Sequence, residues 1–485
     1  MDLVSGFPKN LAYSLKQLSN FTKQTVKVMP DRTNPNLGEV SRFKLPAGAM
    51  IDFRTISIFA DVYLYYGGLG NNNAGYSLHL PRNTASLIQQ ITITCNGVQL
   101  CNINDYNLLF NTLYDLEGAD FSQTSKRFLE NADPSIYFTA GTVSGTGNSP
   151  IASVNAQDGT KTTNFETARP IVINNFLGFL GSLSTPVLDL NDTGDIYIEI
   201  RWASPSVLFG SLNTGTGATS NFSTTTQTQS TSTFQNLRMT CAKINFENSE
   251  YYDIKGQKLV EEGLLVGYYD YWTSRGTAVA KSANVNINFN VATNSLDQCI
   301  ATFQKSDYNT IKTLVLHNSG TGGANISFNT YLSTPDVDTD TTTGLGDGFN
   351  QSYYFMRAGC DLLSSQWSIN STNIDPYPLP PSEIWNQNLI ALGNANIDYG
   401  TAGVHPGCLS LYHFLKYYFC HILSLENLSG DGAHWRSGLS GNGSVVNINY
   451  SATFNSTNGE TISPVIFCRS TKVLTIKAGH LISVV

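Results

Sequence analysis

The sequence predicts an all-β protein built from two tandem β-sandwiches, with short helices in loops and an N-terminal arm. The chain has 485 residues, too many for one ordinary domain of about 100–200 residues but suited to two sandwiches. Charged residues make up 13%, about half of the usual ~25%, whereas Ser, Thr, Asn and aromatic residues are abundant, as on exposed sheet faces. One order of features also occurs twice: long strands, a short helix, a long polar loop and late strands.

We assign residues 1–38 to the N-terminal arm. Leu11, Leu15 and Leu18 are spaced as on one face of a short amphipathic helix. Residues 1–44 hold seven basic and three acidic side chains, so they carry +4, whereas the rest of a chain of net charge −8 carries −12. A basic arm can contact acidic neighbours, nucleic acid or a lipid surface, but an acidic body does not follow a nucleic-acid backbone.

The first sandwich is expected over residues 39–255. Its clearest signal is Asn96-Gly97 between two β-rich runs, which is typical of a two-residue hairpin turn. Asp105 can cap the helix that follows, and Gly118 can end it. Further strands are expected at 51–63, 170–180, 195–204 and 237–246, and polar loops at 67–75, 140–165 and 210–233.

The second sandwich is expected over residues 256–485. Ser382 can cap a short helix that Gly393 closes. Strands are expected at 264–272, 285–291, 299–304, 409–425, 445–454 and in two further runs to the C-terminus, with a long loop at 318–350. Long loops in a compact domain are uncommon unless they have a function, and in a sandwich they project from one end. The doubled pattern therefore predicts two sandwiches of the jelly-roll type.

The eight cysteines are scattered, without the spacing of a disulfide framework, and the N-terminus lacks the charged-then-apolar layout of a signal peptide. We therefore expect reduced core thiols in a protein made in the cytosol or nucleus. No segment approaches the ~20 uninterrupted apolar residues that cross a bilayer.

Two groups of residues were weighed as metal sites. The first holds Zn²⁺-type donors: His405, Cys408, His413, Cys420 and His421. Their spacing is poor, because Cys420 and His421 would point to opposite faces of an extended strand. The second matches positions 1, 3, 5 and 12 of a calcium loop: Asp336, Asp338, Asp340 and Asp347. Thr341 stands where that loop needs Gly, so a solvated loop is favoured. No nucleophile elbow, Cys–His pair or paired carboxylates stand out. We therefore predict no cofactor, no metal, no catalytic residue and no small-molecule substrate: the protein is not an enzyme.

Four stretches together resemble the double jelly-roll major capsid proteins of icosahedral DNA viruses, the lineage of adenovirus-like phages, virophages and polinton-like viruses. RNTASLIQQITITCNGVQLCNINDYNLLFNTLYDLEG at 82–118 looks like the family's strand, NG turn, strand and helix, and DLNDTGDIYIEIRWASPSVL at 189–208 looks like late strands of the first barrel. SSQWSINSTNIDPYPLPPSEIWNQNLIALG at 364–393 resembles the family's proline turn and helix, here with Leu379 between Pro378 and Pro380. The strands at 444–485 have the character of the closing strands.

The resemblance implies a homotrimer whose six barrels form a pseudo-hexagonal capsomer of the shell. Neighbouring capsomers, penton proteins and minor capsid proteins would be its partners, and the N-terminal arm would reach an internal membrane or the genome. The expected location is the virion, after assembly inside the host cell. Two other classes remain open: a β-sandwich adhesin or fibre protein that binds a receptor or glycan, and a hydrolase on a jelly-roll scaffold.

Overall fold

The fold is taken from a computed structural model of the chain. It describes residues 21–66, 76–81, 83–114, 157–158, 169–214, 231–246, 249–281, 284–306, 308–309, 313–317, 331–333, 353–359, 361–391, 411, 414–415, 418–426, 438–441, 444–455 and 461–484.

The first sandwich consists of two facing sheets. One has six strands in the order β1-β12-β3-β7, with β8 and β9 also paired to β3. The other has four strands in the order β2-β10-β5-β6. Their bounds are β1 Phe21–Val28, β2 Val40–Lys44, β3 Met50–Tyr66, β5 Ile88–Cys95, β6 Val98–Asn104, β7 Gln157–Asp158, β8 Arg169–Ile173, β9 Val187–Asp189, β10 Ile196–Trp202 and β12 Thr231–Phe246.

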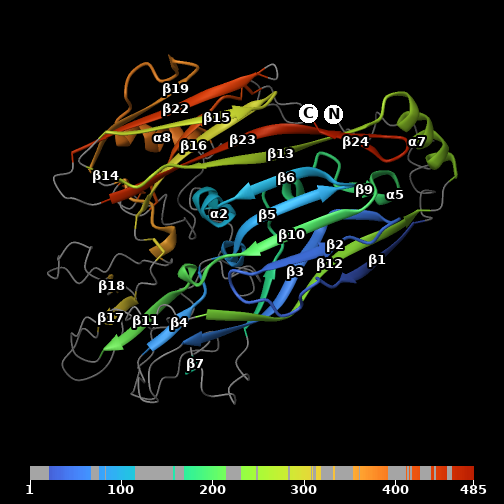
Figure 1. The fold of residues 1–485 in the computed structure, drawn as a ribbon, viewed down its shortest axis with the longest axis horizontal. Helices are drawn as coiled ribbons and strands as arrows, with labels where there is room; N and C mark the ends of the chain where they lie inside the picture. The colour runs from blue at the N-terminus through green and yellow to red at the C-terminus, as the bar shows by residue number, and fades with distance from the viewer. Residues whose placement is uncertain are drawn as a thin grey trace, which may run out of the picture.

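The second sandwich repeats this plan. A six-stranded sheet has the order β13-β23-β16-β21, with β14 and β24 paired to β23, and a four-stranded sheet has the order β15-β22-β19-β20. Their bounds are β13 Leu264–Arg275, β14 Val279–Ala280, β15 Val285–Ala292, β16 Leu296–Lys305, β19 Leu362–Ile369, β20 Thr372–Asn373, β21 His421–Ser424, β22 Val445–Phe454, β23 Thr461–Lys477 and β24 Leu481–Val484. In Figure 1 this sandwich (yellow to red) lies above the first (blue to green). The predicted all-β class with two tandem sandwiches is thus confirmed.

A further sheet, not foreseen from the sequence, joins the two halves of the chain. Its order is β18-β17-β11-β4, with bounds β4 Tyr76–His79, β11 Phe209–Thr214, β17 Thr313–His317 and β18 Tyr331–Ser333. Strand β11 from the first half runs parallel to β17 from the second. The prediction of a loop over 210–233 is therefore wrong at both ends: residues 210–214 belong to β11, which pairs with 313–317 about a hundred residues away, and residues 231–233 belong to β12.

Short helices occupy connections in both halves. The α-helices are α2 Tyr106–Tyr114, α4 Phe179–Ser182, α5 Leu190–Thr193, α7 Ser249–Glu261 and α8 Pro381–Ala391, and the 3-10 helices are η2 Thr84–Leu87, η5 Pro205–Val207 and η6 Tyr353–Phe355. Ser382 lies inside α8 and does not cap it, because the helix already begins at Pro381, whose fixed φ suits the first helical position. Gly118 and Gly393 lie outside the described residues.

The hairpin predicted at Asn96-Gly97 is confirmed. Strands β5 and β6 pair in antiparallel fashion, and Cys95 faces Val98 across the two-residue turn. Asn96 has φ 46° and Gly97 has φ 83°, the two positive values that a type I′ turn requires.

Two expectations need correction. Phe21–Val28, expected within the arm, is a strand that pairs with β12 along its whole length; residues 1–20, with the helix predicted from Leu11, Leu15 and Leu18, lie outside the described residues. The segment 409–425 is not one strand: Leu411, Phe414 and Leu415 are helical, and of its described residues His421–Ser424 pair in a sheet. Its run of aromatic residues suits a buried strand and a buried helix equally.

Each sandwich has an aromatic centre between its sheets. In the first, the rings of Trp202 and Phe234 lie 4.4 Å apart between centroids. In the second, Tyr450 lies 4.5 Å from its cross-strand neighbour Trp367 and 6.0 Å from Phe303 of the six-stranded sheet. All five side chains are buried, so most of the favourable free energy of each sandwich comes from apolar burial between its sheets.

Candidate functional site at the junction of the sandwiches

The two sandwiches meet where β6 of the first lies beside β13 of the second (Figure 1). The β5–β6 hairpin ends at Asp105, whose φ of 49° turns the chain from the strand into α2. The carbonyl of Asp105 accepts the first helical bond, from the N–H of Leu109 at 3.1 Å. Its carboxylate does not cap the helix as predicted, but points at the second sandwich.

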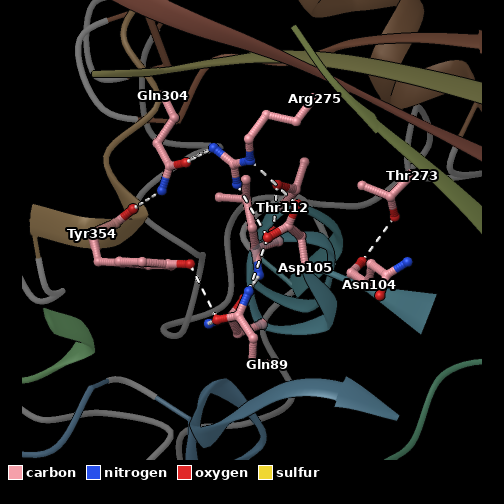
Figure 2. Close-up of polar contacts among 10 residues, drawn as sticks. Gln89, Asn104, Asp105, Thr112, Thr273, Arg275, Gln304 and Tyr354 are labelled. Carbon is pink, nitrogen blue, oxygen red and sulfur yellow. Dashed lines mark hydrogen bonds and ion pairs between the residues drawn. The ribbon is translucent and has the colours of Figure 1, made fainter. Parts of the chain in front are cut away.

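A closed ring of polar contacts crosses this junction, and Figure 2 shows it. Arg275, at the end of β13, lies 3.2 Å from the Asp105 carboxylate and donates to Gln304 Oε1 at 2.7 Å. Gln304 Nε2 donates to the carbonyl of Tyr354 at 2.6 Å, and the Tyr354 hydroxyl donates to Gln89 Oε1 at 3.3 Å. Gln89 Nε2 donates to Asp105 Oδ1 at 2.9 Å, which closes the ring. Two members come from the first sandwich and three from the second, so neither sandwich can complete the ring alone.

Burial and the charge of Asp105 together set the pKa values of this ring. Burial by itself lowers the pKa of Arg275, but the charge of Asp105 and its hydrogen bond outweigh burial, so the pKa lies above its ordinary value. Burial raises the pKa of Tyr354 to about 12. Arg275 is therefore a permanent cation and Tyr354 a permanent hydrogen-bond donor near neutral pH, which fixes the polarity of the ring.

The outer edge of β13 is also covered by the first sandwich. Ser184 and Gly267 exchange two hydrogen bonds, from the Ser184 N–H to the Gly267 carbonyl at 2.8 Å and from the Gly267 N–H to Ser184 Oγ at 2.9 Å. The N–H of Tyr269 donates to Ser182 Oγ at 2.8 Å. These bonds satisfy backbone groups that an edge strand would otherwise expose.

Apolar contacts fill the space behind this edge. The ring of Tyr268 meets Phe179 at 5.0 Å between centroids, and its hydroxyl donates to the Leu100 carbonyl at 2.7 Å. Gly178 has φ +71°, and a Cβ there would lie 2.7 Å from Ile103 Cδ1. Only glycine fits such a position, so the packing at the junction is as close as in a core.

A second ionic cluster lies at the far end of the junction. Lys255 on α7 contacts the carboxylates of Asp189 and Asp192 at 2.5 and 2.9 Å. Burial lowers the pKa of Lys255, but its hydrogen bonds to both carboxylates raise the pKa overall. Nearby, the Asn96 side chain of the hairpin turn donates to the His480 carbonyl at 3.1 Å. The turn between β5 and β6 therefore also contacts the turn between β23 and β24.

The residues weighed as metal ligands are not brought together as a site within the described residues. His421 is buried, with Nδ1 2.9 Å from Ser365 Oγ and Nε2 3.1 Å from Gln387 Oε1, and burial lowers its pKa to about 3. Cys420 is buried next to Asn388. His405, Cys408, His413 and the acidic residues of 336–347 lie outside the described residues. No group of three or more potential ligands occurs in the part of the chain that the structure describes.

The predicted core thiols are confirmed where they can be seen. Cys95, Cys101, Cys241, Cys299, Cys420 and Cys468 are buried and free. Burial raises the pKa of Cys95 to about 11, so it stays a thiol near neutral pH.

Sequence reasoning missed the junction. Asp105 and Arg275 are 170 residues apart, and neither belongs to a motif. The one local signal was the hairpin, which placed Asp105 at the start of a helix but could not name its partner. The arrangement joins the two sandwiches through polar and apolar contacts that both contribute.

Comparisons with known proteins agree with this architecture. No family model matches the chain, and no curated protein matches it. Among solved structures, PBCV-1 VP54, fitted into a cryo-electron microscopy reconstruction of the virophage Sputnik, is similar over 96% of both chains, with a TM-score of 0.55 and 13% identity. A quasi-atomic model of the PBCV-1 virus capsid gives a TM-score of 0.54, 13% identity and 96% of both chains.

A structure of the Sputnik virophage matches 96% of this chain and 88% of its own, with a TM-score of 0.52 and 12% identity. The fold is the double jelly roll. The double jelly roll extends over nearly the whole chain, so both sandwiches and the junction between them belong to one architecture. None of the described helices is long and apolar enough to span a bilayer.

Proposed function

We propose that this chain is the major capsid protein of an icosahedral virus and that it assembles as a homotrimer, a pseudo-hexagonal capsomer. The observation that carries the proposal is the repeated strand order of two sandwiches locked together by the polar ring of Asp105, Arg275, Gln304, Tyr354 and Gln89. A chain with two similar, rigidly joined units gives a threefold assembly six similar flanks, which can tile a surface with copies of a single chain.

The composition supports an assembly protein. Permanent subunit interfaces commonly bury over ~2,000 Å² and favour Tyr and Phe while excluding charge from their centres. The chain supplies 24 Tyr and 25 Phe at a charged fraction of only 13%. We infer a structural and non-enzymatic role in the virion, after assembly within the host cell.

The remaining partners follow from the same proposal. Neighbouring capsomers, penton proteins and minor capsid proteins would contact the outer flanks. The segment before β1, which belongs to the basic N-terminal region, would contact an internal membrane or the genome. We propose that the first sandwich extends from β1 to residue 255, instead of beginning at residue 39, and that the second extends over 256–485, with α7 across the limit as their connection.

Size-exclusion chromatography with light scattering tests the proposal directly. We expect a mass close to three times 52.9 kDa and six-lobed particles in negative-stain electron microscopy. A stable monomer at micromolar concentration would contradict the proposal. A trimer without the six-lobed outline that binds a glycan saturably would favour an adhesin.

A further inference from the structure

The two sandwiches correspond strand by strand, and this correspondence predicts more than the fold. Edge strands β1 and β13 occupy the same place beside β12 and β23, which in turn flank β3 and β16. In the facing sheets β2, β10, β5 and β6 match β15, β22, β19 and β20. The helix after β6 is α2, and the helix after β20 is α8.

Within one chain, the junction joins unlike parts of the two sandwiches. The first contributes its helix corner, formed by the end of β6 and the start of α2 with Asp105. The second contributes its edge strand β13, which carries Arg275. Among the described residues, such a head-to-tail junction leaves the helix corner of the second sandwich and the edge strand β1 of the first without a partner from the other sandwich.

The unused edge strand is β1. On the covered strand β13, the consecutive residues Val266, Gly267 and Tyr268 are all buried. On β1, by contrast, every residue from Thr22 to Thr25 is exposed. An exposed edge strand offers unpaired backbone groups to another chain, so β1 has the open surface that β13 has lost to the first sandwich.

The unused helix corner is the segment from β20 to α8. Every residue of its counterpart α2 is buried. On α8 only Ile384, Asn388 and Leu389 are buried, and they face its own sandwich. The outward face carries Glu383, Asn386 and Ile390 at helical spacing, and the preceding turn adds two exposed apolar side chains, Ile374 and Tyr377.

Charge on the two unused parts is complementary in the same sense as at the junction. There the edge strand supplies a cation, Arg275, and the helix corner supplies an acid, Asp105. On the unused parts, β1 exposes Lys27 and the helix corner exposes Glu383.

We propose that the α8 corner of one copy packs on the β1 edge of a second copy of this chain, and that this contact repeats the junction within each chain. Ile390, Ile374 and Tyr377 form its apolar part and Glu383 with Lys27 its charged part. The inference rests on the proposed trimer and names the surfaces that close it: six sandwiches alternate junctions within chains and between chains around one ring.

A pair of matched substitutions tests the contact. Ile390 and Val445 are both 60% exposed apolar residues of the second sandwich, but Val445 lies on β22, outside the segment from β20 to α8. We expect Ile390→Glu to raise the concentration at which the trimer half-dissociates by at least tenfold, and Val445→Glu to leave it unchanged. Both positions are on the surface, and circular dichroism is expected to show unchanged folding.

The outcomes separate the two proposals. If the unmodified protein is not a trimer, the proposed function fails. If the protein is a trimer but Ile390→Glu leaves it intact, or Val445→Glu weakens it equally, the proposed contact between α8 and β1 is wrong. The proposed trimer is then unaffected. Charge reversal gives a second reading: Lys27→Glu weakens the trimer, and adding Glu383→Lys restores it. If the trimer of the double variant is no more stable than that of Lys27→Glu, Lys27 and Glu383 do not face each other and the proposed contact is wrong.

Discussion

The two sandwiches share one strand order but place their charged side chains differently. The first exposes Arg42 and Lys44 on β2, and Glu199 and Arg201 on β10, across the outer face of its four-stranded sheet. The corresponding sheet of the second sandwich has no charged residue in β15, β19, β20 or β22.

The interiors differ in the opposite direction. The second sandwich fully buries Asp297, Arg357 and His421. In the first, the described buried carboxylates include Asp52, which pairs with Lys23 and Arg54, and Asp189, which pairs with Lys255. A charge in water is screened, whereas a buried charge needs fixed partners. The first sandwich should therefore tolerate loss of charge, and the second should depend on its charged groups.

The largest expected effect comes from Asp297, which is fully buried. Its carboxylate accepts hydrogen bonds from Ser295 Oγ and Thr471 Oγ1, both at 2.7 Å. Asp297→Ala removes two hydrogen bonds to a buried carboxylate, each of which contributes about 1.5–3 kcal/mol, so we expect the free energy of unfolding to fall by about 3 kcal/mol in urea titrations. Asp195, which pairs with Lys44 at the surface, is the control, and Asp195→Ala should change little. Equal losses in the two variants would remove the contrast between the sandwiches.

The junction lies between these extremes, because the Arg275 and Asp105 side chains are 24% and 15% exposed. Arg275→Met keeps the apolar stem but removes the cation and opens the polar ring. We expect a loss of about 2 kcal/mol, since hydrogen bonds to charged groups contribute about 1.5–3 kcal/mol each and partial exposure to water reduces the effect. Thermal unfolding at fixed protein concentration measures it. A loss as small as that of Asp195→Ala would mean that the ring does not hold the sandwiches together.

Titration of His421 gives the second sandwich a pH dependence. Burial lowers the pKa of His421 to about 3, so between pH 6.5 and 3 the unfolded chain binds a proton that the folded chain does not. Stability is then fully present above pH 6.5 and falls as the pH falls, by roughly 2 kcal/mol between pH 7 and 5. Burial raises the pKa of Asp297, which gives a slope of the opposite sign at low pH.

The His421→Gln variant isolates this effect. A glutamine cannot titrate but can still hydrogen-bond to Ser365 and Gln387, so the difference between wild type and variant should shrink by about 2 kcal/mol from pH 7 to pH 5. A difference that stays constant over this range would show that His421 is protonated in the folded protein.

How much of this was accessible from the sequence depends on whether an interaction is local. The Asn96-Gly97 turn was predicted because its geometry is set by two adjacent residues, and α2 because its apolar spacing is local. The sequence places β1 within an arm because its Thr and Lys residues show no apolar period. It places β11 in a loop because its partner β17 lies about a hundred residues away.

The candidate site was harder to predict than the fold for the same reason. The ring of Asp105, Arg275 and Gln304 draws on three strand ends that no motif connects. His421 was noted only as a possible ligand, because the sequence does not reveal that Ser365 and Gln387 occupy its two nitrogens. Pairing between distant segments is set by the packed structure, and single-sequence periodicity does not encode it.

The smallest expected effects distinguish the two outer faces. On the first, the guanidinium of Arg42 lies 4.0 Å from the centroid of the Tyr197 ring, and exposed cation–π contacts contribute about 0.5–1 kcal/mol. On the second, Asn449 Nδ2 donates to Asn286 Oδ1 at 2.6 Å, a bond that water can replace at little cost. We expect Arg42→Gln to lower unfolding free energy by about 0.5 kcal/mol and Asn449→Ser by less. Raising NaCl from about 0.05 to 0.5 M should abolish the first effect by screening and leave the second unchanged. If salt changes both effects equally, the charges on the outer face of the first sandwich do not contribute to its free energy of unfolding. The different placement of charge in the two sandwiches would then have no effect on their stability.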